Sequence, residues 1–167
     1  WLLDSYKPAI FFTGIKDGQF TNNDSLDFKM RISDAFLTSS YFHYLNDSVF
    51  IPKDTTMKIH PPEGKDSIRI TARDTAGNMT DTLVHFICDR TPPKLNVKYP
   101  KGRFAKKKQV VASMEDKYPD SLSCFIDQRV IAFGKGDTTE FAVSDGEKKF
   151  ILEGWDKAGN KADTTFK

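Results

Sequence analysis

A five-residue pattern, Asp-x-Ala-Gly-Asn, occurs twice and carries the residue types best suited to bind a cation or cap a turn. It reads Asp74-Thr-Ala-Gly-Asn78 in the first copy and Asp156-Lys-Ala-Gly-Asn160 in the second. The glycine permits a positive φ, and the aspartate can accept hydrogen bonds from the backbone amides of a tight turn. The same carboxylate is a hard oxygen ligand of the kind that Ca²⁺ prefers. The pattern therefore predicts a capped turn, with cation binding as the alternative.

Residues for catalysis are not arranged as a site. The three histidines, His43, His60 and His85, have no counterparts in the rest of the chain. No serine stands in a Gly-x-Ser-x-Gly elbow, and no glycine-rich phosphate loop precedes a helical segment. A hydrolase needs a nucleophile, a base and an orienting group close together. We therefore expect the chain not to be an enzyme.

One tryptophan has the position of a ligand contact. Trp155 is out of register with Phe150, Leu152 and Gly154, which alternate as one face of a strand. It should therefore point to solvent or to a neighbouring loop, where it could stack on a sugar ring or anchor a protein partner, with Tyr118 as a second aromatic. The alternative is that Trp155 covers the small space above Gly154.

Aspartate followed by Ser or Thr and then by an aliphatic residue or Thr occurs nine times. Random placement of this composition would give roughly one such triplet. The triplet resembles the O-glycosylation site of Bacteroidetes, which implies a location outside the cytoplasm. It is also a good entry from a turn into a strand, because both polar side chains can satisfy loop amides. The central hydroxyl residues are Ser25, Ser48, Thr55, Ser67, Thr75, Thr82, Ser121, Thr138 and Thr164.

The segments around the two Asp-x-Ala-Gly-Asn copies also repeat, which predicts two similar units. The alignment places Leu45 opposite Ile126 and Asp54 opposite Asp137. Residues 1–3 match the end of a last strand, so we expect a tail of a preceding repeat at 1–3 and domains at 4–90 and 91–167. The aligned segments are 4–12 with 89–97, 26–34 with 109–116, 44–50 with 125–131, 54–57 with 137–140, and 67–74 with 149–156.

Apolar residues within each unit alternate with polar ones. Phe28, Met30 and Ile32 are separated by single polar residues, as are Ile68 and Ile70. A period of two is typical of strands with one buried face. Several short strands in about 85 residues, joined by close turns, predict a sandwich of two antiparallel sheets.

The stretches KDSIRITARDTAGN and GEKKFILEGWDKAGN, with DRTPPKL from Asp89, resemble tandem bacterial immunoglobulin-like domains of secreted and surface proteins. That family places an A-x-D-x-A-G-N turn between its last two strands and a D-x-T-x-P linker before the next domain. The resemblance implies an all-β fold of two tandem immunoglobulin-like antiparallel β-sandwiches. Gly154-Trp155 departs from the pattern, which prefers a small residue followed by a polar one.

The resemblance also implies a set of acidic residues at one end of each sandwich. The incoming chain, the loop after the second strand and the last hairpin meet there, and converging carboxylates would suit Ca²⁺. The alternative is that each aspartate caps its own turn and that there is no cofactor. The residues are Asp4, Asp34 and Asp74 in the first domain, and Asp89, Asp116 and Asp156 in the second.

The composition narrows the partners. The net charge is +2 on 25 basic and 23 acidic residues, which is not the basic footprint of a nucleic-acid-binding protein. No apolar run approaches the ~18 residues of a membrane span. Cys88 and Cys124 lack the spacing of metal ligands, and we interpret them as small apolar strand residues. The alternative is that the two cysteines form a disulfide with each other.

These observations predict a structural or adhesive module, a spacer or stalk segment of a larger extracellular or cell-surface bacterial protein. Pro92-Pro93 favours a semi-rigid joint. The expected partners are neighbouring immunoglobulin-like domains of the same chain and a surface glycan or protein. The alternative is a glycan- or protein-binding accessory module of a secreted enzyme.

Overall fold

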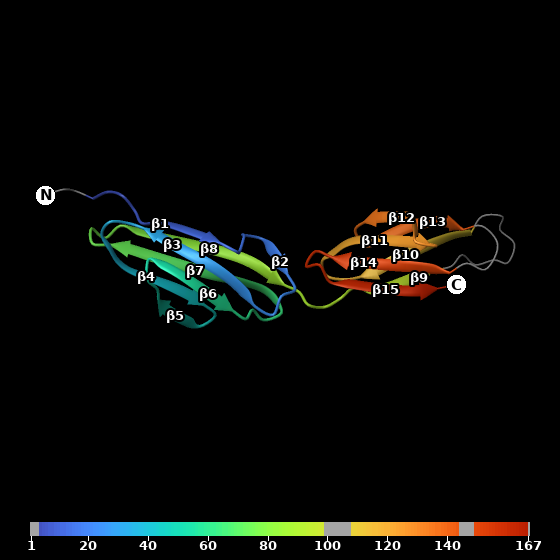
Figure 1. Cartoon of the computed structure of the whole chain (residues 1–167), viewed down its shortest axis with the longest axis horizontal. Helices are drawn as coiled ribbons and strands as arrows, with labels where there is room; N and C mark the ends of the chain where they lie inside the picture. The colour runs from blue at the N-terminus through green and yellow to red at the C-terminus, as the bar shows by residue number, and fades with distance from the viewer. Residues whose placement is uncertain (1–3, 99–107, 144–148, 167) are drawn as a thin grey trace. The chain divides into compact units, whose positions relative to one another are not determined.

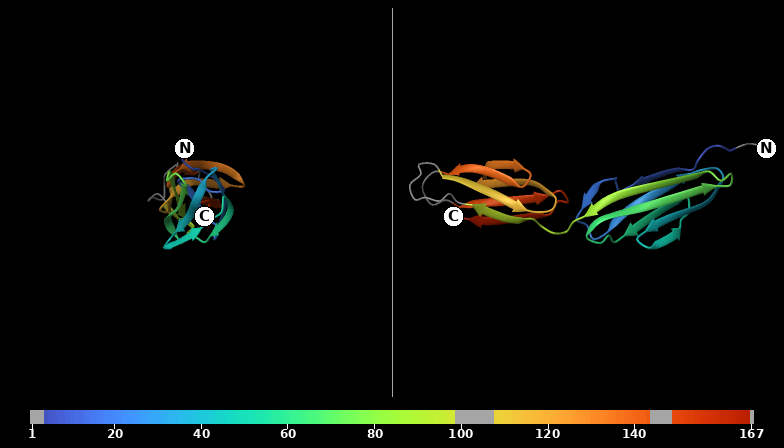
Figure 2. Two further views of the ribbon diagram at one scale, coloured as in Figure 1. Left: turned by 90° about the vertical axis from the view of Figure 1, so that its left-hand side faces the viewer. Right: turned by 180° about the vertical axis from the view of Figure 1, so that it is seen from behind.

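The computed structural model describes residues 4–98, 108–143 and 149–166, and these residues form strands and turns without any helix (Figures 1 and 2). The chain divides into two compact units, Trp1–Asp89 and Arg90–Lys167. The expected tail of a preceding repeat, residues 1–3, lies outside the described residues.

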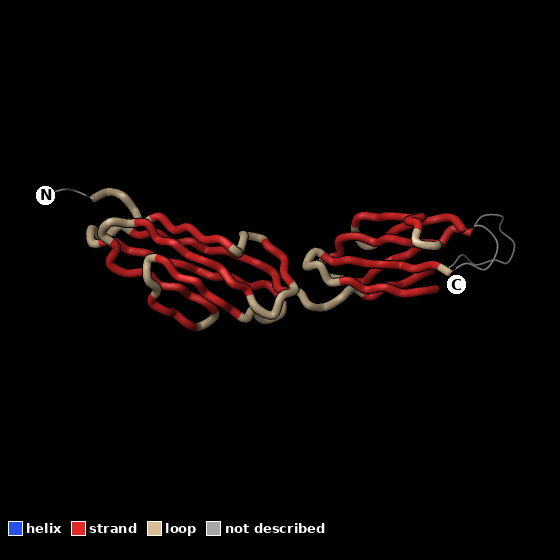
Figure 3. Tube along the Cα trace, viewed as in Figure 1, coloured by secondary structure: helices blue, strands red, loops and turns tan. Residues whose placement is uncertain are grey.

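Unit 1 is built from two sheets (Figure 3). A three-stranded antiparallel sheet has the order β1-β3-β6, and a five-stranded sheet has the order β2-β8-β7-β4-β5, in which β2 alone runs parallel to its neighbour. The strands are β1 (Ala9–Thr13), β2 (Gln19–Thr21), β3 (Leu26–Ser33), β4 (Leu37–Tyr44), β5 (Asp47–Phe50), β6 (Asp54–Ile59), β7 (Gly64–Asp74) and β8 (Met79–Cys88).

Unit 2 repeats this plan in its described residues. One sheet has the order β13-β10-β9 and the other the order β12-β11-β14-β15. The strands are β9 (Lys94–Lys98), β10 (Lys108–Glu115), β11 (Pro119–Ile126), β12 (Arg129–Lys135), β13 (Thr138–Val143), β14 (Phe150–Asp156) and β15 (Lys161–Phe166). The predicted all-β fold of antiparallel sandwiches is confirmed.

The core of each unit follows from the alternation in the sequence. Strand β3 is strictly buried at every second residue, so Phe28 and Ile32 are 1% and 2% exposed while their neighbours face solvent. In unit 2, Leu122 and Leu152 are fully buried between the sheets. Burial of one such side chain contributes about 1.5–3 kcal/mol, which makes these alternating faces the main source of stability.

The register of the β4–β5 hairpin corrects one pair in the sequence alignment. Leu45 is 66% exposed and has a φ of 53° in the two-residue turn that follows Tyr44. The turn of the β11–β12 hairpin is Asp127–Gln128, directly after Ile126. Tyr44, and not Leu45, is therefore the counterpart of Ile126. The alignment matched Leu45 with Ile126 because both are apolar, although Leu45 stands in the turn.

A second correction concerns strands β6 and β13. Asp54 pairs with Arg31, and Thr138 pairs with Ser113, which occupies the place of Arg31 in unit 2. Asp54 therefore corresponds to Thr138 and not to Asp137. The cause is the identical letters Asp-Thr-Thr at 54–56 and 137–139, which stand one residue out of register in the two units.

Candidate functional site

The Asp-x-Ala-Gly-Asn pattern forms the turn between β7 and β8 in unit 1. Asp74 is 2% exposed, and its Oδ1 accepts a hydrogen bond from the Asn78 backbone amide at 2.8 Å. Its Oδ2 accepts a second from Asn78 Nδ2 at 2.7 Å. Gly77 has a φ of 90°, which a residue with a Cβ adopts only under strain. We call Asp74, Gly77 and Asn78, with Asp156, Gly159 and Asn160 in unit 2, the hairpin locks.

Two opposing effects act on the Asp74 carboxyl group. Burial raises its pKa, but hydrogen bonds from the Asn78 side chain and from the backbone amides of Asn78, Ala76 and Gly77 together lower it more. The net pKa lies below the ordinary value. Asp74 is therefore an ionised acceptor at neutral pH, and the turn is closed by charge-assisted hydrogen bonds.

The lock of unit 1 also holds the chain that leads into β1. Asn78 Nδ2 donates to the carbonyl oxygens of Asp4 at 3.0 Å and Tyr6 at 3.1 Å. The incoming segment is thus fastened to the last hairpin of the same unit. The sequence assigned the turn to Asp74 and Gly77 and missed this role of Asn78. The presence of Asn in both copies indicates a role in the turn but does not identify Asp4 and Tyr6 as its partners.

Unit 2 builds the same turn between β14 and β15. Asp156 Oδ1 accepts from the Asn160 backbone amide at 2.9 Å, and its Oδ2 accepts from Asn160 Nδ2 at 2.7 Å. Gly159 has a φ of 89°. The same polar turn therefore closes the last hairpin of both units.

The predicted calcium ligands of unit 1 cap turns. Asp4 Oδ1 accepts from the Tyr6 amide at 3.0 Å, and Asp34 Oδ1 accepts from the Phe36 amide at 2.7 Å. The carboxylates of Asp4, Asp34 and Asp74 do not come together as one group.

The second predicted set is divided between the two units, because Asp89 is the last residue of unit 1 whereas Asp116 and Asp156 belong to unit 2. Asp116 Oδ1 accepts a hydrogen bond from the Tyr118 amide at 2.6 Å, so it caps a turn as Asp34 does. Asp156 closes the hairpin lock of unit 2. A Ca²⁺ site formed by these aspartates stays a prediction.

Trp155 lies on the outer face of its sheet, as its register predicted. It is 38% exposed, and Lys161 Nζ lies 5.5 Å from the ring centroid. The alternative position, above Gly154, is excluded because that space is filled. A Cβ on Gly154 would stand 2.6 Å from Leu95 Cδ2 and 3.3 Å from Met114 Sδ.

Tyr118 is half-buried in the turn that precedes β11. Its carbonyl oxygen accepts from the Lys157 amide at 2.9 Å, and Lys117 Nζ lies 5.3 Å from its ring centroid. In unit 1 the carbonyl of Phe36 accepts from the Thr75 amide in the same way. Tyr118 therefore helps to hold the second lock.

The hydroxyl residues of the nine triplets differ in accessibility. Thr55, Thr82 and Thr164 are half-buried and face the core, because they pair with Met30, Ile70 and Leu152. The side chains best placed for a modifying enzyme are the exposed ones. These are Ser48, Thr75 and Thr138, while Ser25, Ser67 and Ser121 are half-buried.

The histidines and cysteines have structural surroundings. His43 bonds to Ser48 Oγ and Thr71 Oγ1, whereas His85 faces Asp17. Cys88 and Cys124 are both buried thiols, and Cys88 Sγ lies 4.0 Å from the Asn23 carbonyl oxygen. Burial raises the pKa of Cys124 to about 11, so its thiol is unreactive at neutral pH.

No protein-family model and no curated protein matches this sequence. Among solved structures, the chain is similar to the fibronectin(III)-like modules of Clostridium thermocellum CbhA, with 13% identity and a TM-score of 0.54 over 94% of this chain and 91% of that one. This likeness shows the fold, and both units are immunoglobulin-like β-sandwiches. The described residues include no helix that is long and apolar enough to cross a membrane.

Two more distant structures also match. Titin A168–169 is 8% identical with a TM-score of 0.36, over 93% of this chain and 95% of that chain. A glycosyl hydrolase family 2 member from Bacteroides cellulosilyticus is 8% identical with a TM-score of 0.31, over 98% of this chain and 29% of that chain. Scores this low add nothing to the assignment of the fold.

Proposed function

We propose that the chain is a non-catalytic spacer segment of a larger extracellular or cell-surface bacterial protein, which holds or presents its neighbours. The observation that carries the proposal is the lock of unit 1, which joins the incoming chain to the last hairpin through Asn78. A spacer is pulled at its two ends. Such a pull would separate the first segment of unit 1 from its last hairpin. The hydrogen bonds of Asn78 to Asp4 and Tyr6 oppose this separation.

The repetition supports the same function. In both units a buried aspartate, Asp74 or Asp156, closes a turn through hydrogen bonds to an asparagine of the same turn. Pro8 and Pro93, which lead into β1 and β9, are both buried. The proposed partners are therefore adjacent immunoglobulin-like units of the same chain.

The spacer proposal predicts a restricted joint. Spin labels placed on exposed positions of the two units should give one narrow distance distribution by pulsed electron resonance. Replacing Pro92 and Pro93 with glycine should broaden it, because proline fixes φ and glycine does not. A broad distribution in the unaltered chain would argue against a spacer.

A second candidate, a glycan- or protein-binding accessory module, is favoured by the exposure of Trp155. Trp155→Ala should then abolish retention on a polysaccharide column and leave the melting temperature nearly unchanged. Unchanged retention, or no retention of the unaltered chain, would remove Trp155 as a binding residue.

A further inference from the structure

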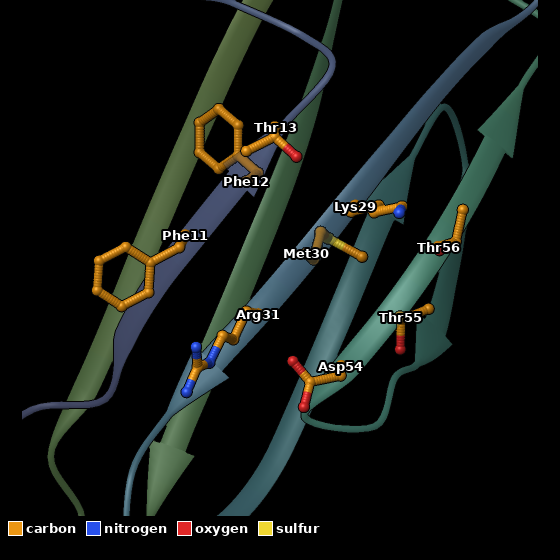
Figure 4. Close-up of a pocket in the computed structure, with 9 residues that line it drawn as sticks. All are labelled: Phe11, Phe12, Thr13, Lys29, Met30, Arg31, Asp54, Thr55 and Thr56. Atoms are coloured by element: carbon orange, nitrogen blue, oxygen red, sulfur yellow. The ribbon is translucent and has the colours of Figure 1, made fainter.

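The outer face of the three-stranded sheet of unit 1 is hollowed (Figure 4). The hollow has a volume of about 440 Å³, within the roughly 300–1,000 Å³ of small-ligand sites. Six outward side chains from β1, β3 and β6 line it: Phe11, Thr13, Lys29, Arg31, Asp54 and Thr56.

The strand register arranges these side chains in two rows. Phe11, Arg31 and Asp54 are direct cross-strand neighbours, and Thr13, Lys29 and Thr56 form the next row. Neighbours of this kind have Cβ atoms about 4.5–5.5 Å apart, so one small ligand can touch several of them. An aromatic ring, two cations, a carboxylate and two hydroxyls therefore share one surface.

The two cations are available to a ligand. In the part of the chain that the structure describes, neither Lys29 nor Arg31 forms an ion pair. This holds even though Asp54 is the direct cross-strand neighbour of Arg31. In the row beyond Lys29 and Thr56, by contrast, the charges do form an ion pair, because Lys58 Nζ lies 3.5 Å from Asp27 Oδ1. Phe11 is 57% exposed, so its ring is open as well.

Unit 2 serves as an internal control for what the fold requires. Its strand register places Asn96, Ser113 and Thr138 in the row of Phe11, and Lys98, Val111 and Glu140 in the row of Thr13. The aromatic ring and both β3 cations are thus absent from the same face of an equivalent sandwich. A sandwich of the same plan therefore forms without these side chains.

We propose that this hollow binds an acidic saccharide, a short oligosaccharide whose sugar rings carry carboxylates. Arg31 holds a carboxylate through its planar fork, and Lys29 adds a second positive charge. Phe11 packs against the apolar face of a sugar ring. Asp54, Thr13 and Thr56 bond to the ring hydroxyls.

A saccharide fits this surface better than an acidic peptide does. The hollow is an open, shallow region of sheet and combines one exposed ring with three side chains that bond to hydroxyls. An acidic peptide such as hexaglutamate would engage the two cations but has no hydroxyl groups to bond to Asp54, Thr13 and Thr56. The proposal does not depend on the spacer function, because a spacer can carry such a site.

The test uses the whole chain and trigalacturonate as the probe, followed by calorimetry and by amide chemical-shift mapping. Phe11→Asn and Arg31→Ser introduce the residues that unit 2 carries at the same positions, so both should fold. We expect each to weaken binding at least tenfold. The matched control, Lys98→Thr, removes an exposed strand cation of unit 2 and should change nothing.

Further outcomes decide the chemistry. The fully methyl-esterified trisaccharide should bind at least tenfold more weakly, and shifts should be confined to β1, β3 and β6. The proposal is overturned if trigalacturonate does not bind, if Arg31→Ser binds as the unaltered chain does, or if a hexaglutamate peptide binds equally well. Such a failure would leave the spacer function untouched, because that function is tested by inter-unit distances.

Discussion

Substitution of Asn78 is the sharpest perturbation of the hairpin lock. Its Nδ2 donates to Asp74 Oδ2 at 2.7 Å and to the carbonyl oxygens of Asp4 and Tyr6 at 3.0 and 3.1 Å. A hydrogen bond to a charged group contributes roughly 1.5–3 kcal/mol and a neutral one about 0.5–1.5 kcal/mol. The two hydrogens of this amide serve one charged and two neutral acceptors, so Asn78→Ala should destabilise unit 1 by about 2–4 kcal/mol.

The nearly isosteric change Asn78→Asp should be worse than Asn78→Ala. It places a carboxylate against Asp74 and against two carbonyl oxygens, so the lost bonds become repulsive contacts. Because the pair repels only when both groups are ionised, acidification should relieve the excess cost. Asn78→Asp is therefore the test of the electrostatic part of the argument.

Scanning calorimetry of the full chain measures both effects. We expect Asn78→Ala to lower the melting transition of unit 1 by about 10 °C or more, since 1 kcal/mol shifts a domain of this size by roughly 4–8 °C. Asn46→Ala, in the exposed turn after β4, is the matched control and should have little effect. A melting transition of Asn78→Ala that resembles this control, or an Asn78→Asp variant more stable than Asn78→Ala, would contradict this role of Asn78.

Three further predictions concern other positions. Gly154→Ala should destabilise unit 2 by about 1–3 kcal/mol by overpacking, because its Cβ would meet Leu95 Cδ2 at 2.6 Å. A denaturant curve followed by tryptophan fluorescence checks this, and an unchanged midpoint would show that the core accommodates the added methyl group. The lowered pKa of Asp74 gives unit 1 stability that is fully present above the ordinary value of 3.8 and is lost as the pH falls through the lower folded pKa; acid titration of Asp74→Asn should lack this loss, and a curve parallel to that of the unaltered chain would contradict it. Millimolar Ca²⁺ should raise the melting temperature of EDTA-treated protein by mass action if the aspartates predicted from the sequence bind it; no rise would assign Asp116 and Asp156 to turn capping alone.

The fold was predictable because its signals are local. The alternation around Phe28 and Ile68 determines which face of each strand is buried. In β3 and in β7 the apolar face is the buried one, as expected. The outward position of Trp155 followed from the same period of two. A side chain's face depends only on its parity within a strand, so no knowledge of the partner strand was needed.

The features that depend on distant segments were not predictable. The tie from Asn78 to Asp4 joins residues at the two ends of the unit, and no spacing in the sequence reports such a contact. The hollow on the outer face takes residues from three strands, and in the sequence Lys29 and Arg31 are ordinary members of a solvent-facing alternation. Leu45 was misaligned because an apolar residue stands in a turn, and Asp54 was misaligned because the letters Asp-Thr-Thr recur one residue out of register in unit 2.

The proposal that each unit is a closed mechanical element of a spacer can be tested by pulling a single molecule at its two termini. We expect two separate unfolding events, each releasing roughly 250–300 Å of chain at about 3.4 Å per residue. Asn78→Ala should lower the force of one event only. Extension without distinct events, or equal forces with and without Asn78, would contradict the claim.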